Sequence, residues 1–395
     1  MSENNENKEP LNKNNKVPKL RFNKYADEWK TDNFLKHFDN FSSNSLCWDD
    51  LNYDNGFYRN LHYGIIHSNS SNLIKFNLLP YVNEDKLPKK FTLIKDGDLI
   101  LADTSEDRKD VAKGIEIINT NDKIISGLHT IHLREKHNET IDGYKAYYVA
   151  SKSFRNFARK YCEGIKVFSI KPSLLKYAHF SYPVNKKEQE MIVNLFNNLE
   201  EKKLLIERKI SILKKYKEGL IKYLVNDSQK IIDISKIITV CDKTKYGSSY
   251  GNSTGKYKFF INSSNDEVKY TDDYTYDGEY LVLNTGGSAF TNYINERFSA
   301  MSDCLIVKPV KEYSISIYYW LKANEDKINF VGFQGTGLKH LDVNWLLRQK
   351  IKIIDYDNKK LLSLNKTIDS IIQLNSFKLD YLKKLKEYFL NNLFI

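Results

Sequence analysis

The chain has 395 residues and 41% of them are hydrophobic, so its length and composition predict about two domains with packed cores. Lys and Arg number 61 against 50 Asp and Glu, and the resulting net charge of +11 favours a polyanionic partner. The four cysteines (Cys47, Cys162, Cys241 and Cys304) are scattered without a C-x-x-C pair, which argues against a disulfide framework or a metal site and fits a reducing cytoplasm. No run of about 18 apolar residues occurs, so no membrane span is expected.

The first half begins with a polar segment and continues into a mixed globular region. Residues 1–16 are rich in Asn, Lys and Glu, which predicts a disordered tail instead of a signal peptide. Residues 17–184 are predicted to form the first globular domain. Within them, 96–102 indicates a turn followed by a buried strand, and 124–133 indicates a strand pair or one bulged strand. Residues 145–160 have a helical pattern.

A long helix is predicted over residues 185–226, because almost no helix breaker occurs there. Apolar residues recur between positions 192 and 224 with a mean spacing of about 3.5, which is the seam of a coiled coil. At about 1.5 Å per residue, roughly 39 helical residues span about 58 Å. Such a length exceeds that of an ordinary core helix, so much of this helix is expected to pack outside a compact domain.

The second half of the sequence repeats the first. The segment Gly-Ile-Lys-Val at 164–167 is followed 171 residues later by Gly-Thr-Gly-Leu at 335–338, with similar apolar residues after each. The segment Leu-Lys-Lys-Tyr-Lys-Glu at 213–218 reappears as Leu-Lys-Lys-Leu-Lys-Glu at 382–387. This period is far longer than that of a solenoid repeat, so it predicts two copies of a module that consists of a domain and a helix.

The second module is predicted to have its globular domain at 227–356 and its helix at 357–395. We therefore expect an α+β fold with two similar globular domains joined by a pair of long antiparallel coiled-coil helices, related by a pseudo-twofold axis. Polar residues interrupt the seams at Lys202 or Lys203 and at Asn375, where they either set the register or mark a solvated gap. The residues predicted for helix pairing and partner docking are Ile192, Leu199, Ile206, Leu213, Leu220, Leu364, Ile368, Ile371, Leu382 and Leu385.

The sequence motifs of common enzymes are missing. The sequence contains no phosphate-binding P-loop, no H-E-x-x-H and no Asn-Pro-Pro-Tyr/Phe motif for amino-methyl transfer. His129 and His132 stand three apart in a predicted strand, where successive side chains alternate between faces, so they are not expected to bind one ion. We predict neither a catalytic residue nor a metal site.

Several loops are candidates for ligand binding. Residues 245–257 carry lysines that suit phosphates and Ser, Asn and Tyr that suit phosphates or base edges, with a flexible surface loop as an equal alternative. Residues 284–288 either cup an anion with their backbone N–H groups or form a tight turn. The equivalent segments 161–167 and 333–339 contain glycines, which either permit close approach to a ligand or form a hinge or packing turn. In the polar loop 103–108, Arg108 is the candidate for a phosphate.

A set of short motifs follows a fixed order along the chain. In the first half these are Pro18-Lys-Leu-Arg-Phe22, Trp29, Pro183-Val184, Glu188-Gln189 and the helical segment 213–219. In the second half they are Thr271-Asp-Asp-Tyr-Thr-Tyr-Asp-Gly278, Thr285-Gly-Gly287 and Phe298-Ser-Ala-Met-Ser-Asp303. Together with the internal repeat, this set resembles the DNA-specificity subunit of type I restriction–modification enzymes (the HsdS family) over residues 17–395. The second copy departs from the pattern, because it has Asp357-Asn358 in place of the Glu-Gln pair.

The resemblance implies two target recognition domains that each read one half of a split DNA sequence in the major groove, while the helices fix the spacer. It implies as partners two methyltransferase (M) subunits, which bind S-adenosylmethionine, and restriction (R) subunits, which use ATP and Mg²⁺. The helices and adjoining domain surfaces would dock them. This chain is then a non-catalytic cytoplasmic subunit without a cofactor of its own, and it positions double-stranded DNA for adenine extrusion into a partner. The candidate DNA contacts are Arg59, Tyr63, Arg108 and Lys166 in the first domain, and Tyr246, Ser248, Tyr250, Asn252, Lys256, Thr285, Ser288 and Lys339 in the second.

Two other classes of function stay open. A stand-alone DNA-binding or anti-restriction protein of the same fold would bind DNA without a methyltransferase partner. A coiled-coil adaptor that binds proteins through its globular ends would assemble independently of DNA and salt. A solitary enzyme is disfavoured by the missing motifs.

Overall fold

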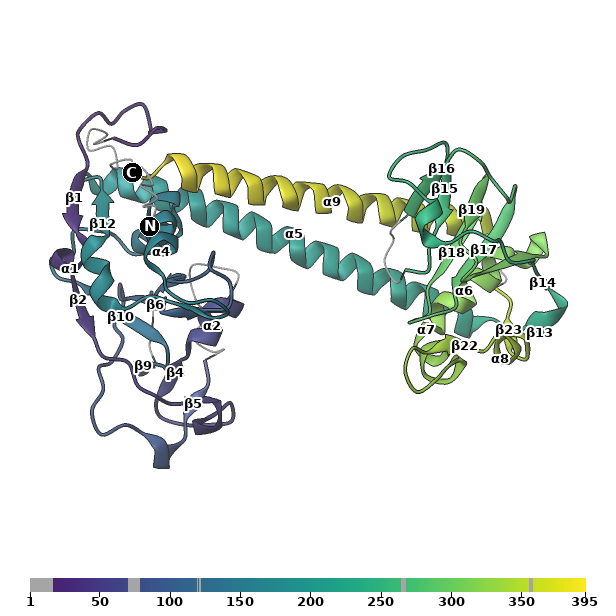
Figure 1. Cartoon of the computed structure of the whole chain (residues 1–395), viewed down its shortest axis with the longest axis horizontal. Coiled ribbons are helices and arrows are strands. Elements are labelled where there is room, and N and C mark those ends of the chain that lie inside the picture. The colour runs from purple at the N-terminus through teal and green to yellow at the C-terminus, as the bar shows by residue number, and fades with distance from the viewer. Residues whose placement is uncertain (1–16, 70–78, 119, 121, 264–267, 355–357) are drawn as a thin grey trace, which may run out of the picture. The chain divides into compact units, whose positions relative to one another are not determined.

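The computed structural model describes residues 17–69, 79–118, 120, 122–263, 268–354 and 358–395 (Figure 1). The predicted tail at 1–16 lies outside these residues. The chain divides into two compact units: unit 1 is Met1–Ile206 with Lys378–Ile395, and unit 2 is Glu207–Phe377. Each long helix is thus divided between the units instead of forming a separate domain. Every helix in the described ranges is too short or too polar to cross a membrane.

Unit 1 is built on an antiparallel sheet with the strand order β2-β10-β6-β8. Its strands are β2 (Phe38–Phe41), β10 (Thr130–Glu135), β6 (Leu99–Ala102) and β8 (Gly114–Glu116). All four side chains of β6 are buried, because Leu99 and Leu101 face a core shared with helices whereas Ile100 and Ala102 face a second sheet. The buried strand predicted within 96–102 is therefore confirmed.

The second sheet of unit 1 has the order β3-β5-β4-β9, and β4 and β9 pair in parallel. Its strands are β3 (Leu51–Asn52), β5 (Tyr81–Val82), β4 (Arg59–Leu61) and β9 (Ile124–Ser126). Two further antiparallel pairs complete the unit: β1 (Lys30–Asn33) with β12 (His179–Tyr182), and β7 (Thr104–Ser105) with β11 (Phe168–Ser169). The segment 124–133 thus holds two strands that belong to different sheets, β9 and β10.

The short helices of unit 1 are α1 (Phe34–His37), α2 (Tyr63–Ser68), α3 (Tyr144–Ala150) and α4 (Lys152–Tyr161), with 3-10 turns at Trp48–Asp50, Glu84–Lys86 and Pro172–Tyr177. The helix predicted over 145–160 is interrupted at Ser151, whose backbone is extended (φ −66°, ψ 158°). This break lets α3 bury nearly all its side chains while α4 keeps a polar face.

Residues of the N-terminal motif, Arg21 and Trp29, form hydrogen bonds with the first turn of the first long helix. The guanidinium of Arg21 donates two hydrogen bonds to the carboxylate of Glu188, at 2.7 and 2.8 Å, and the indole N–H of Trp29 donates a third. The side chain of Gln189 donates to the carbonyl of Pro183 and accepts from the N–H of Ile141. Two motifs about 160 residues apart in sequence are therefore parts of one packed joint between the helix and its domain.

A buried ionic network lies at the centre of unit 1. The ammonium of Lys145 lies 2.9 Å from Glu116 and 3.5 Å from Glu135, and all three side chains are almost fully buried. Glu135 also contacts the imidazole of His37 at 2.9 Å and accepts the hydroxyl of Thr140. Burial raises the pKa of Glu135, but His37, Lys145 and Thr140 outweigh that effect and bring the pKa down to about 2. The network joins α3 to strands β8 and β10.

Unit 2 has the same sheet order as unit 1. Its antiparallel central sheet, β14-β20-β17-β18, consists of β14 (Ile238–Val240), β20 (Cys304–Pro309), β17 (Glu279–Asn284) and β18 (Thr291–Asn295). The second sheet, β16-β15-β19, consists of β16 (Val268–Thr271), β15 (Tyr257–Phe260) and β19 (Phe298–Ala300). Two further strand pairs complete unit 2: β13 (Ile231–Asp233) with β23 (Lys350–Lys352), and β21 (Phe333–Gln334) with β22 (His340–Leu341).

The helices of unit 2 are α6 (Ser314–Ala323), α7 (Glu325–Lys327), a π-helical turn at Ile328–Gly332 and α8 (Val343–Leu347), with 3-10 turns at Ile234–Lys236, Ser248–Tyr250 and Lys311–Tyr313. The core alternates as in unit 1: Leu281 and Leu283 of β17 face the helices, whereas Tyr280 and Val282 face the second sheet.

The two units match in their central sheets and in the parallel strand pair of their second sheets, whereas β3 of unit 1 has no counterpart strand in the second sheet of unit 2. The central sheets correspond in order, and the parallel pair β4–β9 of unit 1 corresponds to the parallel pair β15–β19 of unit 2. In both units the second strand of the parallel pair leads through a short turn into the long strand of the central sheet, β10 or β20. The predicted duplication of an α+β module is confirmed at the level of strand pairing.

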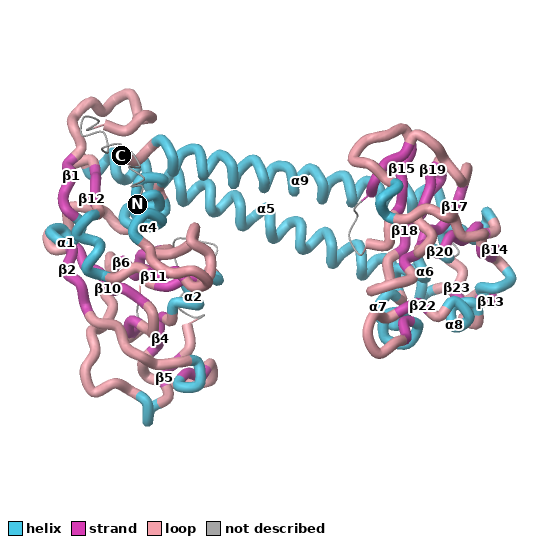
Figure 2. Tube along the Cα trace, in the orientation of Figure 1, coloured by secondary structure: helices cyan, strands magenta, loops and turns pink. Residues whose placement is uncertain are grey.

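The long helices α5 (Lys186–Asp227) and α9 (Asn358–Asn392) are continuous and run antiparallel within each unit (Figures 1 and 2). In unit 1, Glu200 of α5 contacts Lys386 of α9; in unit 2, Lys217 contacts Asp369. The side chains turned toward the partner helix alternate at spacings of three and four residues. On α5 they are Ile192, Phe196, Leu199, Lys203, Ile206, Ile210, Leu213, Lys217, Leu220 and Leu224, and on α9 they are Leu361, Asn365, Ile368, Ile372, Asn375, Leu379, Leu382, Lys386 and Phe389.

Two residues predicted for helix pairing and partner docking, Leu364 and Ile371, lie at the surface of the helix. These side chains are 42% and 36% exposed, whereas Asn365 and Asn375 are buried in the seam. The amide nitrogen of each asparagine donates to the carbonyl four residues earlier on its own helix, and that of Asn365 also donates to the hydroxyl of Tyr319. The side-chain oxygen of Asn365 is buried without a hydrogen-bond partner among the described residues.

The polar residues of the seam in unit 1 form an ion cluster. Glu200 accepts from Lys203 at 3.1 Å and from Lys386 at 2.5 Å. Burial lowers the pKa of Lys386, although Glu200 opposes this shift. Burial raises the pKa of Glu200, but the two lysines outweigh it and hold the pKa below its usual range. The break predicted at Lys202 or Lys203 is therefore a paired, largely buried position at Lys203, not a solvated gap.

Candidate nucleic-acid interface

In unit 1 a glycine hairpin packs against the loop that follows the central strand β6. The backbones of Glu163 and Ser169 exchange two hydrogen bonds of 2.9 and 2.8 Å, which close a hairpin with its tip at 164–167. The N–H of Ile170 donates to the carbonyl of Asp103, and β11 pairs with β7. Lys166 at the tip and Arg108, in the loop that β7 enters, are both exposed. The structure therefore brings together the two segments that carry these predicted contacts.

Unit 2 has the same arrangement in the same register. Gln334 and His340 pair across a hairpin with its tip at 335–339, and these positions lie 171 residues after Glu163 and Ser169. The N–H of Leu341 donates to the carbonyl of Thr285, as that of Ile170 does to Asp103. Predicted contacts in the Thr285–Ser288 loop and at Lys339 therefore lie on one hairpin and its neighbouring loop.

A short turn connects this hairpin-and-loop pair to an aromatic loop in each unit. In unit 2, the N–H of Ser302 donates to the carbonyl of Tyr246, and the hydroxyl of Thr285 donates to the carbonyl of Asp303. In unit 1, the corresponding turn holds His129, which has a positive φ of 56° and contacts Asp103 at 3.2 Å. The ring of Tyr63 packs edge-on against His129 at 5.3 Å. Tyr63 thus adjoins the predicted surface as a half-buried support.

The predicted contact loop of unit 2, residues 245–257, is ordered by its own hydrogen bonds. Tyr246 and Tyr250 stack with ring centroids 4.1 Å apart, and Asn252 exchanges two backbone hydrogen bonds with Tyr270. The carbonyl of Ser248 accepts the ammonium of Lys269. The side chains of Ser248, Tyr250, Asn252 and Lys256 remain exposed, so they are available to a ligand.

The counterpart of this loop in unit 1 was missed in the sequence. Residues 42–58 precede β4 as 241–256 precede β15, and each loop contains one 3-10 turn, Trp48–Asp50 or Ser248–Tyr250. Its aromatic side chains Trp48, Tyr53 and Phe57 are exposed. The local signal was an aromatic-rich loop before a strand, the same signal that drew attention to 245–257.

The side chain of Trp48 rests on an uncharged support. Its ring lies 4.4 Å from the imidazole of His62, which is buried and in turn packs against Tyr63 at 4.6 Å. Burial, followed by the nearby imidazole of His129, lowers the pKa of His62. The indole is tilted by 42° against this imidazole, whose uncharged form burial favours, and its exposed face is of the kind on which bases stack.

Internal hydrogen bonds already engage two of the predicted binding groups. The guanidinium of Arg59 is committed within the unit, because it pairs with Asp122 at 2.8 Å and donates to the carbonyl of Leu79 and the hydroxyl of Tyr81. Of the two alternatives for residues 284–288, the tight turn is favoured over the anion cup, because several N–H groups of the segment and of the adjoining Ala289 already have acceptors. Those of Thr285 and Gly286 donate to Asn262, that of Gly287 donates to the carbonyl of Lys339, and that of Ala289 donates to Asn329. The segment is a tight turn.

Within the described ranges, one group of side chains has the composition of a metal site. Ligand atoms of Asp32, His37 and Glu139 lie within 4.8 Å of one another. The ammonium of Lys30 and the hydroxyl of Tyr182 already bond to Glu139, and the second nitrogen of His37 faces Glu135. These groups balance one another's charge, so we interpret the cluster as a structural ion-pair network.

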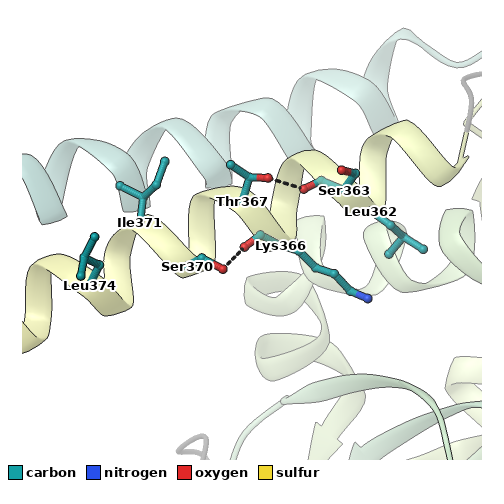
Figure 3. A pocket seen from close by; sticks show the side chains of 7 residues that line it. All are labelled: Leu362, Ser363, Lys366, Thr367, Ser370, Ile371 and Leu374. Atoms are coloured by element: carbon teal, nitrogen blue, oxygen red, sulfur yellow. Dashed lines mark hydrogen bonds between the residues drawn. The ribbon is translucent and has the colours of Figure 1, made fainter.

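The outer faces of the long helices carry exposed apolar side chains. In unit 2 a shallow groove runs along α9, lined by Leu362, Ser363, Lys366, Thr367, Ser370, Ile371 and Leu374 (Figure 3). The hydroxyls of Thr367 and Ser370 donate to carbonyls four residues earlier on the helix, so the groove offers mainly aliphatic surface. In unit 1 a second groove is lined by Lys202, Leu205, Ile206, Lys378, Tyr381 and Leu382. Exposed apolar patches of this kind mark protein interfaces.

Comparisons with known proteins identify the fold. No protein-family model matches the sequence, and no curated protein matches it. The S subunit of the type I restriction-modification system from M. genitalium matches with a TM-score of 0.60 and 14% identity, over 96% of this chain and 99% of that chain. A chain from a structure that concerns complex assembly and conformational transition of the type I R-M system matches with a TM-score of 0.58 and 10% identity, over 92% and 96%. The chain therefore has the fold of a type I S subunit, as the sequence resemblance predicted.

Proposed function

We propose that this chain is the DNA-specificity subunit of a type I restriction–modification complex. One observation carries the proposal: a hairpin is joined by the same backbone hydrogen bond to the loop after the central strand in both modules, in a chain that shares the S-subunit fold over 96% of its length. Two similar surfaces with different side chains suit a split DNA target with two different halves.

Each module would bind DNA through exposed cations and polar side chains at this surface. Lys166 and Arg108 in unit 1, and Lys256 and Lys339 in unit 2, are exposed and suited to phosphates. Ser248, Asn252 and Tyr250 offer groups that can reach base edges. These contacts set the position of the DNA, and the chemistry belongs to other subunits, which bring S-adenosylmethionine, ATP and Mg²⁺.

The partners in this proposal are two M subunits, docked on the helices and adjoining domain surfaces, and the R subunits of the complex. The exposed apolar grooves of α9 in unit 2 and of α5 with α9 in unit 1 support two docking positions. Such a complex would work on DNA in the cytoplasm.

The test is co-expression of this chain with the methyltransferase subunit encoded beside it, in a host without its own methylases, followed by single-molecule methylation sequencing. A new bipartite motif with methyladenine on both strands is expected. If a stable complex forms but methylates no motif, the specificity role is wrong and a stand-alone DNA binder takes its place. Assembly that ignores both DNA and salt would instead favour a protein adaptor.

A further inference from the structure

The tips of the two hairpins carry aliphatic side chains that fold no core. Ile165 is 93% exposed and Val167 52% exposed in unit 1, and Leu338, at the position equivalent to Val167, is 69% exposed in unit 2. Single exposed apolar residues are common on proteins. Here, however, they recur at the same projecting element of both modules, beside the residues proposed to meet DNA.

The hairpins hold these side chains in a fixed position. Gly164 has a φ of 126°, and a Cβ there would overlap the carbonyl oxygen of Val167, so only glycine fits this turn. Gly335 has a φ of 136°, and a Cβ there would lie 2.9 Å from the carbonyl oxygen of Leu338. The paired backbones behind each tip anchor it to the loop after the central strand. The conformation of each tip is therefore fixed by its glycine turn and by the backbone hydrogen bonds behind it.

The charge around the tips favours a polyanion over a protein partner. The tip 164–167 includes Lys166 and no acidic residue, whereas Lys171 behind it pairs with Glu163 at 3.4 Å; residues 335–341 include Lys339 and His340 and no acidic residue. At each tip an exposed aliphatic side chain lies next to a lysine, Lys166 or Lys339, in sequence. The lysine can attract a phosphate, and the aliphatic side chain offers an apolar surface. This is the composition of side chains that enter between base pairs, where Ile and Leu act as wedges that unstack a base step.

We propose that the hairpin tips of both modules are DNA wedges, with Ile165 and Val167 entering one half-site and Leu338 the other. The inference rests on the proposed function and goes beyond it, because it assigns a distortion of DNA to this chain. Unstacking costs a few kcal/mol per step, and it lowers the barrier to extruding a neighbouring adenine into a partner subunit. The specificity subunit would then prepare the base as well as select the site.

The test uses the complex with the co-expressed methyltransferase subunit and duplexes that carry the motif found by methylation sequencing. 2-Aminopurine replaces single bases beside the methylated adenine in each half-site, and its fluorescence reports unstacking. The variants are Ile165→Ser with Val167→Ser, and Leu338→Ser. Val184→Ser and Ile231→Ser remove exposed aliphatic side chains elsewhere in the same units and are the matched controls.

We expect the wild-type complex and both controls to give a fluorescence rise in each half-site. The unit 1 variant should lose it in one half-site and the Leu338 variant in the other, with methylation of the affected half slowed about tenfold. Equal fluorescence and methylation in all variants would overturn the proposal. Variants that no longer co-purify with the methyltransferase subunit would also overturn it and make the tips a protein contact. If the wild-type chain directs no methylation and binds no DNA, the proposed function is refuted. The wedge proposal, which rests on it, is then refuted as well.

Discussion

Replacing Lys145 with methionine tests whether the buried ionic network holds unit 1 together. Its ammonium is the only positive group within hydrogen-bonding distance of Glu116 among the contacts of the described chain, at 2.9 Å. Glu135 would keep His37 and Thr140, whereas Glu116 would keep only backbone donors such as the N–H of Ala146. Removing one partner of a buried ion pair costs about 3–5 kcal/mol, because the other charge stays buried and uncompensated.

That loss is large against the total stability of a domain, about 5–15 kcal/mol. With a urea dependence of about 2 kcal/mol per molar, Lys145→Met should lower the unfolding midpoint of unit 1 by roughly 1.5–2.5 M urea. Hydrogen exchange during urea titration assigns the transition to peptides of unit 1 or unit 2. The double variant Lys145→Met with Glu116→Leu removes both charges and should recover most of the loss.

The reasoning would be refuted in two ways. A shift below about 0.5 M for Lys145→Met would mean that Glu116 is not held as a charged group by this lysine. Burial raises the pKa of Glu116 by more than Lys145 and the backbone N–H groups of Ala146 and Gly143 lower it. A double variant as unstable as the single one would mean that the loss comes from packing, not from an uncompensated charge.

Four further outcomes are expected. The pKa of Glu135 is about 2 in the folded state and 4.5 as its ordinary value, so its stabilisation is present above about pH 4.5 and is lost as the pH falls toward 2; acid unfolding of Glu135→Gln should lack that step. Gly164→Ala should distort the hairpin at a cost of about 1–3 kcal/mol and weaken DNA binding, whereas Gly337→Ala, which meets nothing within 4 Å, should not; binding assays and melting curves compare them. Replacing Lys256 and Lys339 together by glutamine should reduce the slope of log affinity against log salt by about 2, and an unchanged slope would place the phosphates elsewhere. Inserting about one helical turn into both α5 and α9 should change the spacer of the methylated motif and leave its two halves unchanged, which methylation sequencing reads directly.

The sequence predicted features that depend on long patterns. The duplication, the two long helices and the buried strand at 96–102 all follow from periodicity summed over many residues. The misplaced positions depend on single contacts. Leu364 and Ile371 were predicted for helix pairing and partner docking from apolar spacing, yet both are exposed, whereas the nearby Asn365 and Asn375 are buried and donate hydrogen bonds to their own helix. The spacing of apolar residues does not show whether a buried side-chain amide will donate a hydrogen bond to a carbonyl of its own helix.

Binding residues were harder to predict than the fold, because availability is a tertiary property. Arg59 is a cation beside a strand, as a phosphate contact would be, but Asp122 lies 63 residues away in sequence and neutralises it. The sequence left open whether the N–H groups at 284–288 bind an anion or form a tight turn, and in the structure Asn262 accepts hydrogen bonds from those of Thr285 and Gly286. Trp48, Tyr53 and Phe57 became candidates only when strand pairing aligned their loop with residues 241–256.

The way in which the two modules are built bears on how such a protein changes what it recognises. In each candidate interface the fixed parts are backbone hydrogen bonds, such as Ile170 to Asp103 and Leu341 to Thr285, and glycine turns at Gly164 and Gly335. The side chains that project from these parts contribute little to either core, since they are exposed. Substitutions among them should therefore cost little stability while they change the contacts with bases. A scaffold held by its backbone can carry two different recognition surfaces in one chain, and the difference between the tips, Ile-Lys-Val against Thr-Gly-Leu, is the kind of variation that it permits.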